Sequence, residues 1–262
     1  MNNADSAQIN EVASAVFFPR PDMPYGPDAK GATDHLFDLK GGERLRIRLF
    51  LSDKDAPAIL FFHGNGETAR DYDPLADDYR ALPASFIVAD YRGYGPSTGK
   101  PSFNTFLADA HETMDEVKAL LAKLGHTGPL GVMGRSLGSA PAIELAASRA
   151  SEISCLIIES GFAKTVPLLR LIGIPVDVLG ITEDHGPRNL AKMATVSLPT
   201  LVLHAEDDEI IPISQADLLF DANKDPKKFY VRVPRAGHND IQMRAGESYF
   251  AAISDLIKRV HK

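Results

Sequence analysis

The sequence is poor in cysteine, with one among 262 residues, and this excludes an intrachain disulfide. Cys155 lies in the apolar run 153–158, which predicts a buried packing role and is typical of a reducing compartment. Paired cysteines and the His-x-x-x-His pattern of metal-binding helices are also missing. We therefore expect neither a metal ion nor another cofactor.

Positive charge is scarce as well, since 28 lysines and arginines stand against 35 aspartates and glutamates, for a formal net charge of −7. The chain has neither the basic footprint of a nucleic-acid-binding protein nor a basic block for an anionic membrane surface. No apolar run reaches membrane-spanning length, and the N-terminus lacks the basic and apolar parts of a signal peptide. We expect a cytoplasmic protein without a transmembrane segment, whose partner is a small-molecule or acyl-ester substrate.

What the chain does contain is the hydrophobic pattern of one α/β domain over residues 1–262. Residues 18–30 carry four prolines and predict an irregular arm. Residues 35–39 and 45–51 alternate apolar and polar side chains around a glycine pair, which predicts a half-exposed antiparallel hairpin. From Ala58 onward, short apolar runs alternate with helix-length segments, as in a mostly parallel sheet with helices on both faces. The runs cover residues 58–62, 86–89, 130–133, 153–158, 200–203 and 229–233, and the main helical stretches cover 103–124, 214–222 and 241 to the end.

The connection over residues 162–197 is longer than a single helix requires. Its apolar part, residues 166–181, is interrupted by proline and glycine, which predicts short helical pieces over the carboxyl edge of the sheet. Because long structured insertions are usually functional, we interpret this segment as a small lid with an apolar acyl pocket. The alternative is an irregular loop that fills out the core. The candidate pocket residues are Leu168, Leu169, Leu171 and Ile172.

The segment Gly134–Gly138 reads Gly-Arg-Ser-Leu-Gly and fits the Gly-x-Ser-x-Gly nucleophile elbow. An apolar run precedes it and a helix-forming stretch follows it, so Ser136 would lie on a tight strand-to-helix turn at the positive end of the helix dipole. A second match, Gly95–Gly99, lacks this context, because a proline precedes its serine and Lys100-Pro101 stands where a helix should begin. Ser136 is therefore the candidate nucleophile, and Ser97 is expected to be a loop residue.

A serine nucleophile requires a base, and the base requires an acid that orients it. Residues 204–212 begin at the end of one apolar run and supply several carboxylates, and residues 235–240 follow the last run and supply His238. Because the carboxyl ends of parallel strands lie at one edge of a sheet, these groups would meet Ser136 there. The order serine, aspartate, histidine is the one expected for a hydrolase built on such a sheet.

Five segments form a set that runs through most of the chain. They are Phe61–Gly66, Asp90–Gly95 with Ser97 and Gly99–Pro101, Gly134–Gly138, His204–Pro212 and Gly237–Asn239. Together they resemble the α/β-hydrolase superfamily, and most of all the small-lid serine hydrolases grouped with fungal BEM46 and with the membrane-tethered protein depalmitoylases. The resemblance implies an α/β-hydrolase fold with a small helical lid. It also implies Asp208 as the catalytic acid, in preference to Asp207 and Glu206, and His238 as the base.

Two backbone N–H groups are expected to form the oxyanion hole, that of Leu137 after the serine and that of Asn65 in the turn after the first parallel strand. Arg135, inside the elbow, has two interpretations: a contact to an acidic substrate group, or a solvated side chain, which we favour. Asp90 and Arg92 are expected to brace their own loop.

These residues predict a cofactor-independent serine hydrolase that cleaves carboxylic ester or thioester bonds through an acyl-enzyme. Peptide cleavage and acyl transfer are alternatives on the same triad. Gly64–Ala69 also fits the Gly-x-Gly-x-x-Ala fingerprint of dinucleotide-binding oxidoreductases, with Asp90 placed for a ribose, but His63 and Pro74 disagree with that interpretation. A hydrolase fold that serves only for binding is a further alternative.

Overall fold

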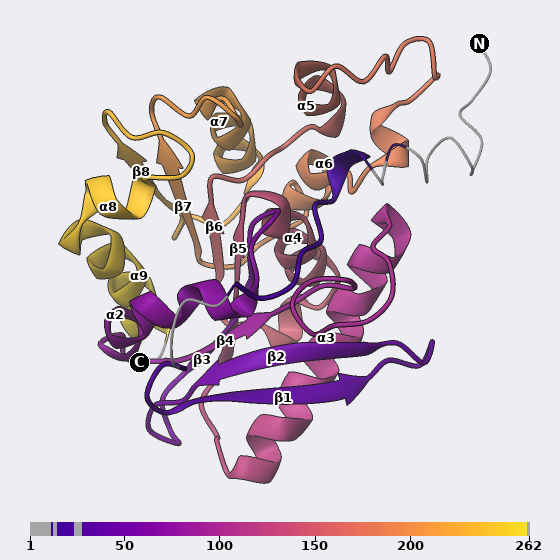
Figure 1. Ribbon diagram of the computed structural model, residues 1–262. Coiled ribbons are helices and arrows are strands. Elements are labelled where there is room, and N and C mark those ends of the chain that lie inside the picture. The colour runs from indigo at the N-terminus through magenta and orange to yellow at the C-terminus, as the bar shows by residue number, and fades with distance from the viewer. Residues whose placement is uncertain (1–11, 13–14, 24–27, 261–262) are drawn as a thin grey trace.

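The computed structural model describes residues 12, 15–23 and 28–260, and it contains an eight-stranded sheet (Figure 1). The sheet begins with the predicted hairpin, in which β1 (Ala32–Asp38) pairs antiparallel with β2 (Arg44–Phe50). Gly42 in the connecting turn has a φ of 91°, which glycine adopts without a steric penalty. The glycine pair therefore sets the turn, as its sequence predicts.

The six apolar runs after the hairpin form six parallel strands, as predicted. β2 joins them through an antiparallel pairing with β4, and all other neighbours in this part of the sheet pair in parallel. The order across the sheet is β1-β2-β4-β3-β5-β6-β7-β8. The strands are β3 (Ala58–Phe62), β4 (Ser85–Ala89), β5 (Leu130–Arg135), β6 (Leu156–Glu159), β7 (Thr200–Ala205) and β8 (Phe229–Val233). The central strands are buried on both faces, which explains why they read as continuous apolar runs.

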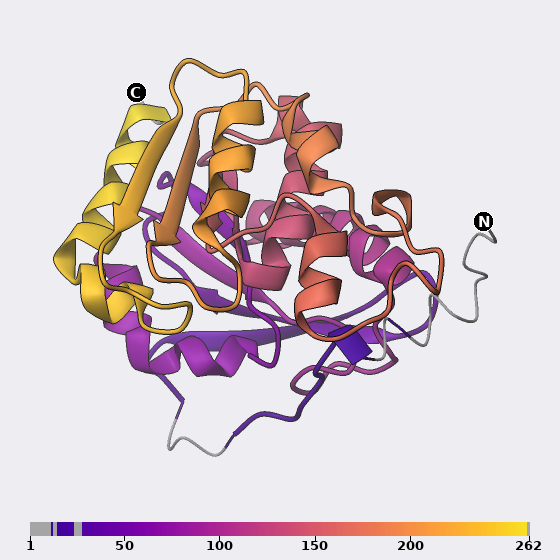
Figure 2. The same cartoon turned by 90° about the horizontal axis from the view of Figure 1, so that it is seen from above.

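Helices pack on both faces, and Figure 2 shows α7 and α9 on opposite sides of β7 and β8. One face carries α3 (Phe103–Leu124), α4 (Ser139–Ser148) and α7 (Ile213–Ala222), whose apolar side chains join one core cluster. The other face carries η1 (Ala69–Leu75), α2 (Ala76–Arg80) and α9 (Glu247–Val260). A short turn, η3 (Ala150–Glu152), precedes β6. No helix within the described ranges combines the length and hydrophobicity that a bilayer crossing requires.

The last helical stretch is not continuous, contrary to the prediction from its apolar pattern. α8 (Ile241–Ala245) ends at Gly246, whose φ of 54° and ψ of −133° lie outside the helical region. α9 begins at the next residue. The break lets Ile241 and Tyr249 pack into the same core cluster from two differently directed helices.

The connection between β6 and β7 contains short helices, as its prolines and glycines predict. They are α5 (Thr165–Leu171), η4 (Glu183–His185) and α6 (Asn189–Met193). Figure 1 shows α5 beyond the carboxyl ends of the central strands, at the top of the view. Leu169, Val176 and Ile181 form a small apolar cluster with Val12, separate from the two cores on the sheet. Part of the connection between β6 and β7 is thus held in place by this small cluster and not by the two cores of the sheet.

The predicted half-exposed hairpin is wrong for β2, where Arg46 and Arg48 are only 1% and 2% exposed. The arm before the hairpin lies over them: Arg46 donates to Asp22 of the arm at 2.6 Å, and its Nε donates to the buried Asp90 at 2.6 Å. Arg48 donates to carboxylates at 2.6 to 2.8 Å in the same way. The charged positions that predicted a solvated face are instead neutralised by carboxylates of the arm, of the neighbouring strand β1 and of segments after β3 and β4.

We expect Arg46→Met to lower the free energy of unfolding by about 3 to 5 kcal/mol, because the substitution leaves the buried Asp90 without its cation. Arg44→Met is the matched control on the same strand, since Arg44 and its partner Asp38 are 55% and 62% exposed. Urea denaturation measures both variants. Equal effects of the two substitutions would contradict the role given to the buried cluster.

Candidate active site

Ser136 lies where β5 passes into the short turn η2 (Ser136–Gly138) and then into α4. Its φ is 52°, in the left-handed region, as the strained serine of a nucleophile elbow requires. A Cβ on Gly134 would collide with the carbonyl oxygen of Gly138, and one on Gly138 would collide with that of Phe62. The two glycines of the motif are therefore required by close backbone approach, and the spacing of the motif follows from this turn.

Ser136, His238 and Asp208 form one chain of hydrogen bonds. Nε2 of His238 lies 2.9 Å from Oγ of Ser136, and Nδ1 of His238 lies 2.8 Å from Oδ2 of Asp208. All three residues are buried, with 4% to 7% of their surface exposed. The structure thus brings together the three residues predicted from the sequence, although Asp208 and Ser136 lie 30 and 102 positions before His238 in the chain.

The carboxylate bonded to His238 is that of Asp208, and the neighbouring Asp207 and Glu206 are exposed. Oδ1 of Asp208 accepts the backbone N–H groups of Ile210 and Ile211 at 3.0 and 2.7 Å, which fixes the carboxylate below the imidazole. Burial alone would raise the pKa of Asp208, but the bonds from His238 and Ile211 outweigh it and lower this pKa below its ordinary value. The group is therefore held as a carboxylate that accepts from Nδ1.

A second histidine supports this acid. Nε2 of His204 donates to the carbonyl of Ile211 at 2.8 Å and lies 3.4 Å from Oδ2 of Asp208. His204 is fully buried, and burial lowers its pKa despite the carbonyl and the carboxylate nearby. These contacts give His204 a structural role beside Asp208.

The turn that contains Asn65 is fixed by the arm. Oδ1 of Asn65 accepts from the backbone N–H of Phe18 at 2.9 Å and from the hydroxyl of Tyr94 at 2.7 Å, and Nδ2 donates to the carbonyl of Val16 at 2.6 Å. Among the residues that the structure describes, no protein group accepts from the backbone N–H of Asn65 or from that of Leu137. Both donors are therefore available to a ligand. The anchoring of the turn by the arm had no signal in the local sequence.

Arg135 contradicts the prediction of a solvated side chain, because only 12% of it is exposed. Its guanidinium pairs with Glu67, donates to Glu159 at 3.2 Å, and donates to the carbonyl of His238 and to Oδ1 of Asn239, both at 3.1 Å. Every nitrogen of the group is bound to protein, which also disagrees with a contact to an acidic substrate group. One signal was present in the sequence, since Glu159 is a lone carboxylate at the end of a buried apolar run.

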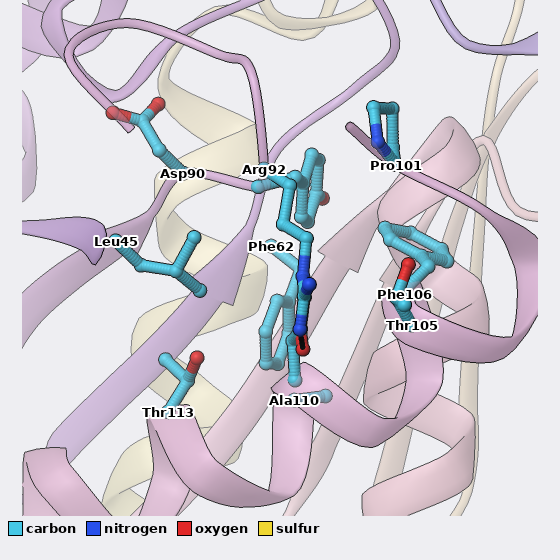
Figure 3. A pocket seen from close by; sticks show the side chains of 11 residues that line it. Leu45, Phe62, Asp90, Arg92, Pro101, Thr105, Phe106, Ala110 and Thr113 are labelled. Carbon is cyan, nitrogen blue, oxygen red and sulfur yellow. Dashed lines mark hydrogen bonds and ion pairs between the residues drawn. The ribbon is translucent and has the colours of Figure 1, made fainter. Parts of the chain in front are cut away.

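The loop after β4 has a structural role, as predicted for Asp90 and Arg92. Arg92 makes two hydrogen bonds of 2.7 Å to Asp109 on α3, and Figure 3 shows it beside Phe62 on the wall of a cavity of about 10 Å³. Asp90 is 1% exposed and accepts from Arg46, from His63 and from the backbone of η1, so it has no free oxygen for a ribose. The dinucleotide interpretation therefore fails at its acidic residue.

Ser97 is a loop residue, as predicted. Its Oγ accepts the backbone N–H of Arg46 at 3.0 Å, and it lies outside every helix and strand.

The four candidate pocket residues on the connection between β6 and β7 do not line one pocket. Leu168 packs against the main core, and Leu169 is buried in the small cluster with Val176. Leu171 and Ile172 are 63% and 57% exposed. The physical reason is the register of α5, which turns successive side chains toward different neighbours.

The sequence and the fold both match known hydrolases. The family described as serine aminopeptidase, S33 matches residues 53–173. Protein bem46 of Schizosaccharomyces pombe is 32% identical over 214 residues, which cover 79% of this chain and 69% of bem46. The α/β hydrolase domain-containing protein WAV2 of Arabidopsis thaliana is 26% identical over 210 residues, 74% of this chain and 67% of WAV2.

Among solved structures, the esterase Pf2001 of Pyrococcus furiosus has a TM-score of 0.74, with 92% of this chain and 99% of that chain covered. At 17% identity, this similarity shows a shared fold. The relationship to bem46 is close enough in sequence and extent to establish the family. The chain therefore belongs to the α/β-hydrolase superfamily, within the group of Bem46-like proteins, and it is a hydrolase.

Proposed function

We propose that the protein is a serine hydrolase that cleaves carboxylic ester or thioester bonds through an acyl-enzyme. The observation that carries this proposal is the continuous chain of hydrogen bonds from Oγ of Ser136 through His238 to Asp208. A hydroxyl bound to an imidazole, which is itself bound to a buried carboxylate, is the arrangement that activates a serine as a nucleophile.

The chemistry follows from the positions of these atoms. As Oγ of Ser136 attacks the carbonyl carbon, Nε2 of His238 takes its proton, and Asp208 stabilises the resulting imidazolium. The backbone N–H groups of Asn65 and Leu137 would hold the oxyanion of the tetrahedral intermediate. His238 then protonates the leaving alcohol or thiol, and the acyl group stays on Ser136. A water molecule that loses a proton to His238 attacks the acyl-enzyme, and His238 returns the proton to Oγ of Ser136 as the acyl–Oγ bond breaks and the acid leaves.

The bond could also be a peptide bond, since the matching family is described as a serine aminopeptidase, whereas Pf2001 is an esterase. An aminopeptidase of this kind would need a free carboxylate for the terminal ammonium group of its substrate. Glu67 and Glu159, the carboxylates that line the cavity beside the elbow together with Asp71, are already paired with Arg135. This pairing favours the ester or thioester.

We expect a fluorophosphonate probe to label the wild-type protein at Ser136, because the probe reacts with a serine hydroxyl that a base has activated. Peptide mass spectrometry identifies the labelled residue. Ser136→Ala should remove the label, whereas Ser97→Ala, at the serine of the second Gly-x-Ser-x-Gly match, should be labelled like the wild type. Labelling that survives Ser136→Ala would overturn the assignment.

Hydrolysis by the same preparation distinguishes the bond classes. We expect p-nitrophenyl esters and acyl thioesters to be cleaved with a higher kcat/KM than aminoacyl p-nitroanilides. A series of acyl lengths also tests whether residues 162–197, with the exposed Leu171 and Ile172, select the acyl group. A preference for the anilides would replace the esterase by the aminopeptidase on the same triad.

A further inference from the structure

Arg135 joins four separate segments of the chain through one guanidinium group. It follows β5 directly and precedes Ser136, so its backbone belongs to the nucleophile elbow. Its side chain contacts the turn after β3, the end of β6, and the loop that carries His238. The side chain therefore links the nucleophile to the other loops that form the site.

The first connection reaches the loop of the base. Nη2 of Arg135 donates to the backbone carbonyl of His238 and to Oδ1 of Asn239, both at 3.1 Å. The other side-chain anchor on the backbone of His238 is Glu209, whose carboxylate accepts the N–H of His238 at 3.1 Å and which is exposed. Both bonds to the backbone of His238 are partly buried, and the guanidinium is held in addition by Glu67 and Glu159, so it is the firmer attachment of this loop.

The second connection reaches the turn that carries Asn65. Oε1 of Glu67 pairs with Arg135, while its Oε2 accepts the backbone N–H of Gly64 at 2.8 Å and the hydroxyl of Tyr72 at 2.7 Å. A Cβ on Gly64 would collide with the side chains of both Arg135 and Glu67. The guanidinium thus packs directly under the turn and holds it through Glu67.

The third connection fixes Arg135 itself. Its Nε donates at 3.2 Å to Glu159, which is 4% exposed and whose second oxygen accepts the hydroxyl of Tyr249 at 2.6 Å. A guanidinium that binds carboxylates on two sides keeps little rotational freedom, and its planar donors fix direction as well as distance. The remaining nitrogen then points at the loop of the base in one orientation.

From this geometry we propose that Arg135 is a positioning residue. It holds His238 at hydrogen-bond distance from Ser136 and keeps the backbone donor of Asn65 directed at the oxyanion. The proposal rests on the proposed serine-hydrolase function. Arg135 contacts no reacting atom, so its loss should lower kcat, which depends on the alignment of catalytic groups, and leave KM nearly unchanged.

Three variants test this role in ester hydrolysis. We expect Arg135→Ala to lower kcat by about 10²-fold, as a small misplacement of catalytic groups does, with KM changed less than about threefold. Because this variant leaves Glu67 and the buried Glu159 without their cation, Arg135→Lys provides a form that keeps the charge but not the planar set of donors. Asn239→Ala removes one bond at an exposed side chain, so its fold is not at risk, and a smaller loss of kcat is expected.

Rescue by free guanidinium separates positioning from a general loss of stability. Arg135 lines a cavity of about 200 Å³ beside Asn239 and Tyr72, so the space left in Arg135→Ala is accessible to a small cation. Millimolar guanidinium should raise the kcat of Arg135→Ala and leave the wild type unchanged. Arg92→Lys is the matched control: its guanidinium binds Asp109 away from the site, so this variant should lose Tm but keep its kcat.

The outcomes distinguish this proposal from the proposed function. If Ser136 is labelled by the fluorophosphonate and folded Arg135→Lys and Asn239→Ala have the wild-type kcat, the positioning role is wrong and the hydrolase stands. An equal loss of kcat in Arg92→Lys, or no rescue of folded Arg135→Ala, also overturns the role. If the wild type is not labelled at Ser136, the proposed function itself fails.

Discussion

Replacement of His238 by alanine is expected to lower kcat for ester hydrolysis by about 10⁶-fold, as much as the loss of the nucleophile itself. The reason is that Nε2 of His238 lies 2.9 Å from Oγ of Ser136 as its base, and an unassisted hydroxyl is a poor nucleophile at neutral pH. KM should change little, because neither the side chain of His238 nor that of Ser136 is needed to hold the substrate. Steady-state rates with the best p-nitrophenyl ester measure the effect.

Two controls accompany this prediction. His185→Ala removes a histidine from the connection between β6 and β7, where its ring contacts Thr182, and it should keep the wild-type rate. The double variant Ser136→Ala/His238→Ala should be no slower than either single variant, since the two residues act as one unit. A double variant that is slower by the product of the single effects would show that Ser136 and His238 act independently.

Asp208→Asn is expected to lower kcat by about 10⁴-fold while the fold is retained. The carboxylate accepts a hydrogen bond from the N–H at Nδ1 of His238 at 2.8 Å, which leaves Nε2 free to take the proton of Ser136. An asparagine can present its amide to Nδ1 and stabilise the wrong tautomer of the imidazole. Asp207→Asn, one residue earlier and exposed, should have nearly the wild-type kcat.

Asp208→Asn should also lower the stability of the fold by an amount that depends on pH. The pKa of Asp208 is lowered in the folded protein, so its charge stabilises the fold above the ordinary value of 3.8. This contribution is lost as the pH falls through the lowered pKa. Asp208→Asn should therefore reduce Tm at neutral pH, and the difference from the wild type should shrink in strong acid. For the activity prediction, a full loss of activity in Asp207→Asn would instead identify Asp207 as the catalytic acid.

The strands and the elbow could be predicted because their signals are local. A buried parallel strand such as β3 must be apolar on both faces, and the turn at Ser136 needs small residues two positions on either side. The broken final helix could not be predicted, because Gly246 is tolerated within a helix and only packing selects its conformation.

The three residues of the triad could be predicted from the sequence, whereas most of the contacts around them could not. Ser136, Asp208 and His238 follow strand ends, so their meeting at one edge of the sheet follows from topology. Because arginine side chains are usually exposed, the sequence predicts exposed side chains for Arg135 and Arg46. Their burial depends on carboxylates that come from segments far away in the chain. Glu159 at the end of an apolar run indicates that a cation lies nearby, but which arginine binds it depends on tertiary contacts that no local pattern encodes.

The attachment of the arm to Asn65 has a consequence for how relatives can diverge. Asn65 binds the carbonyl of Val16 and the N–H of Phe18, which are backbone groups that nearly every amino acid provides. Substitutions at positions 16 and 18 can therefore leave these hydrogen bonds in place, whereas Asp22 of the arm is fixed by its side chain on Arg46. Proline at position 18 is the exception, because it has no N–H to donate. The side chains at positions 16 and 18 can thus change while the turn of Asn65 keeps the same hydrogen bonds.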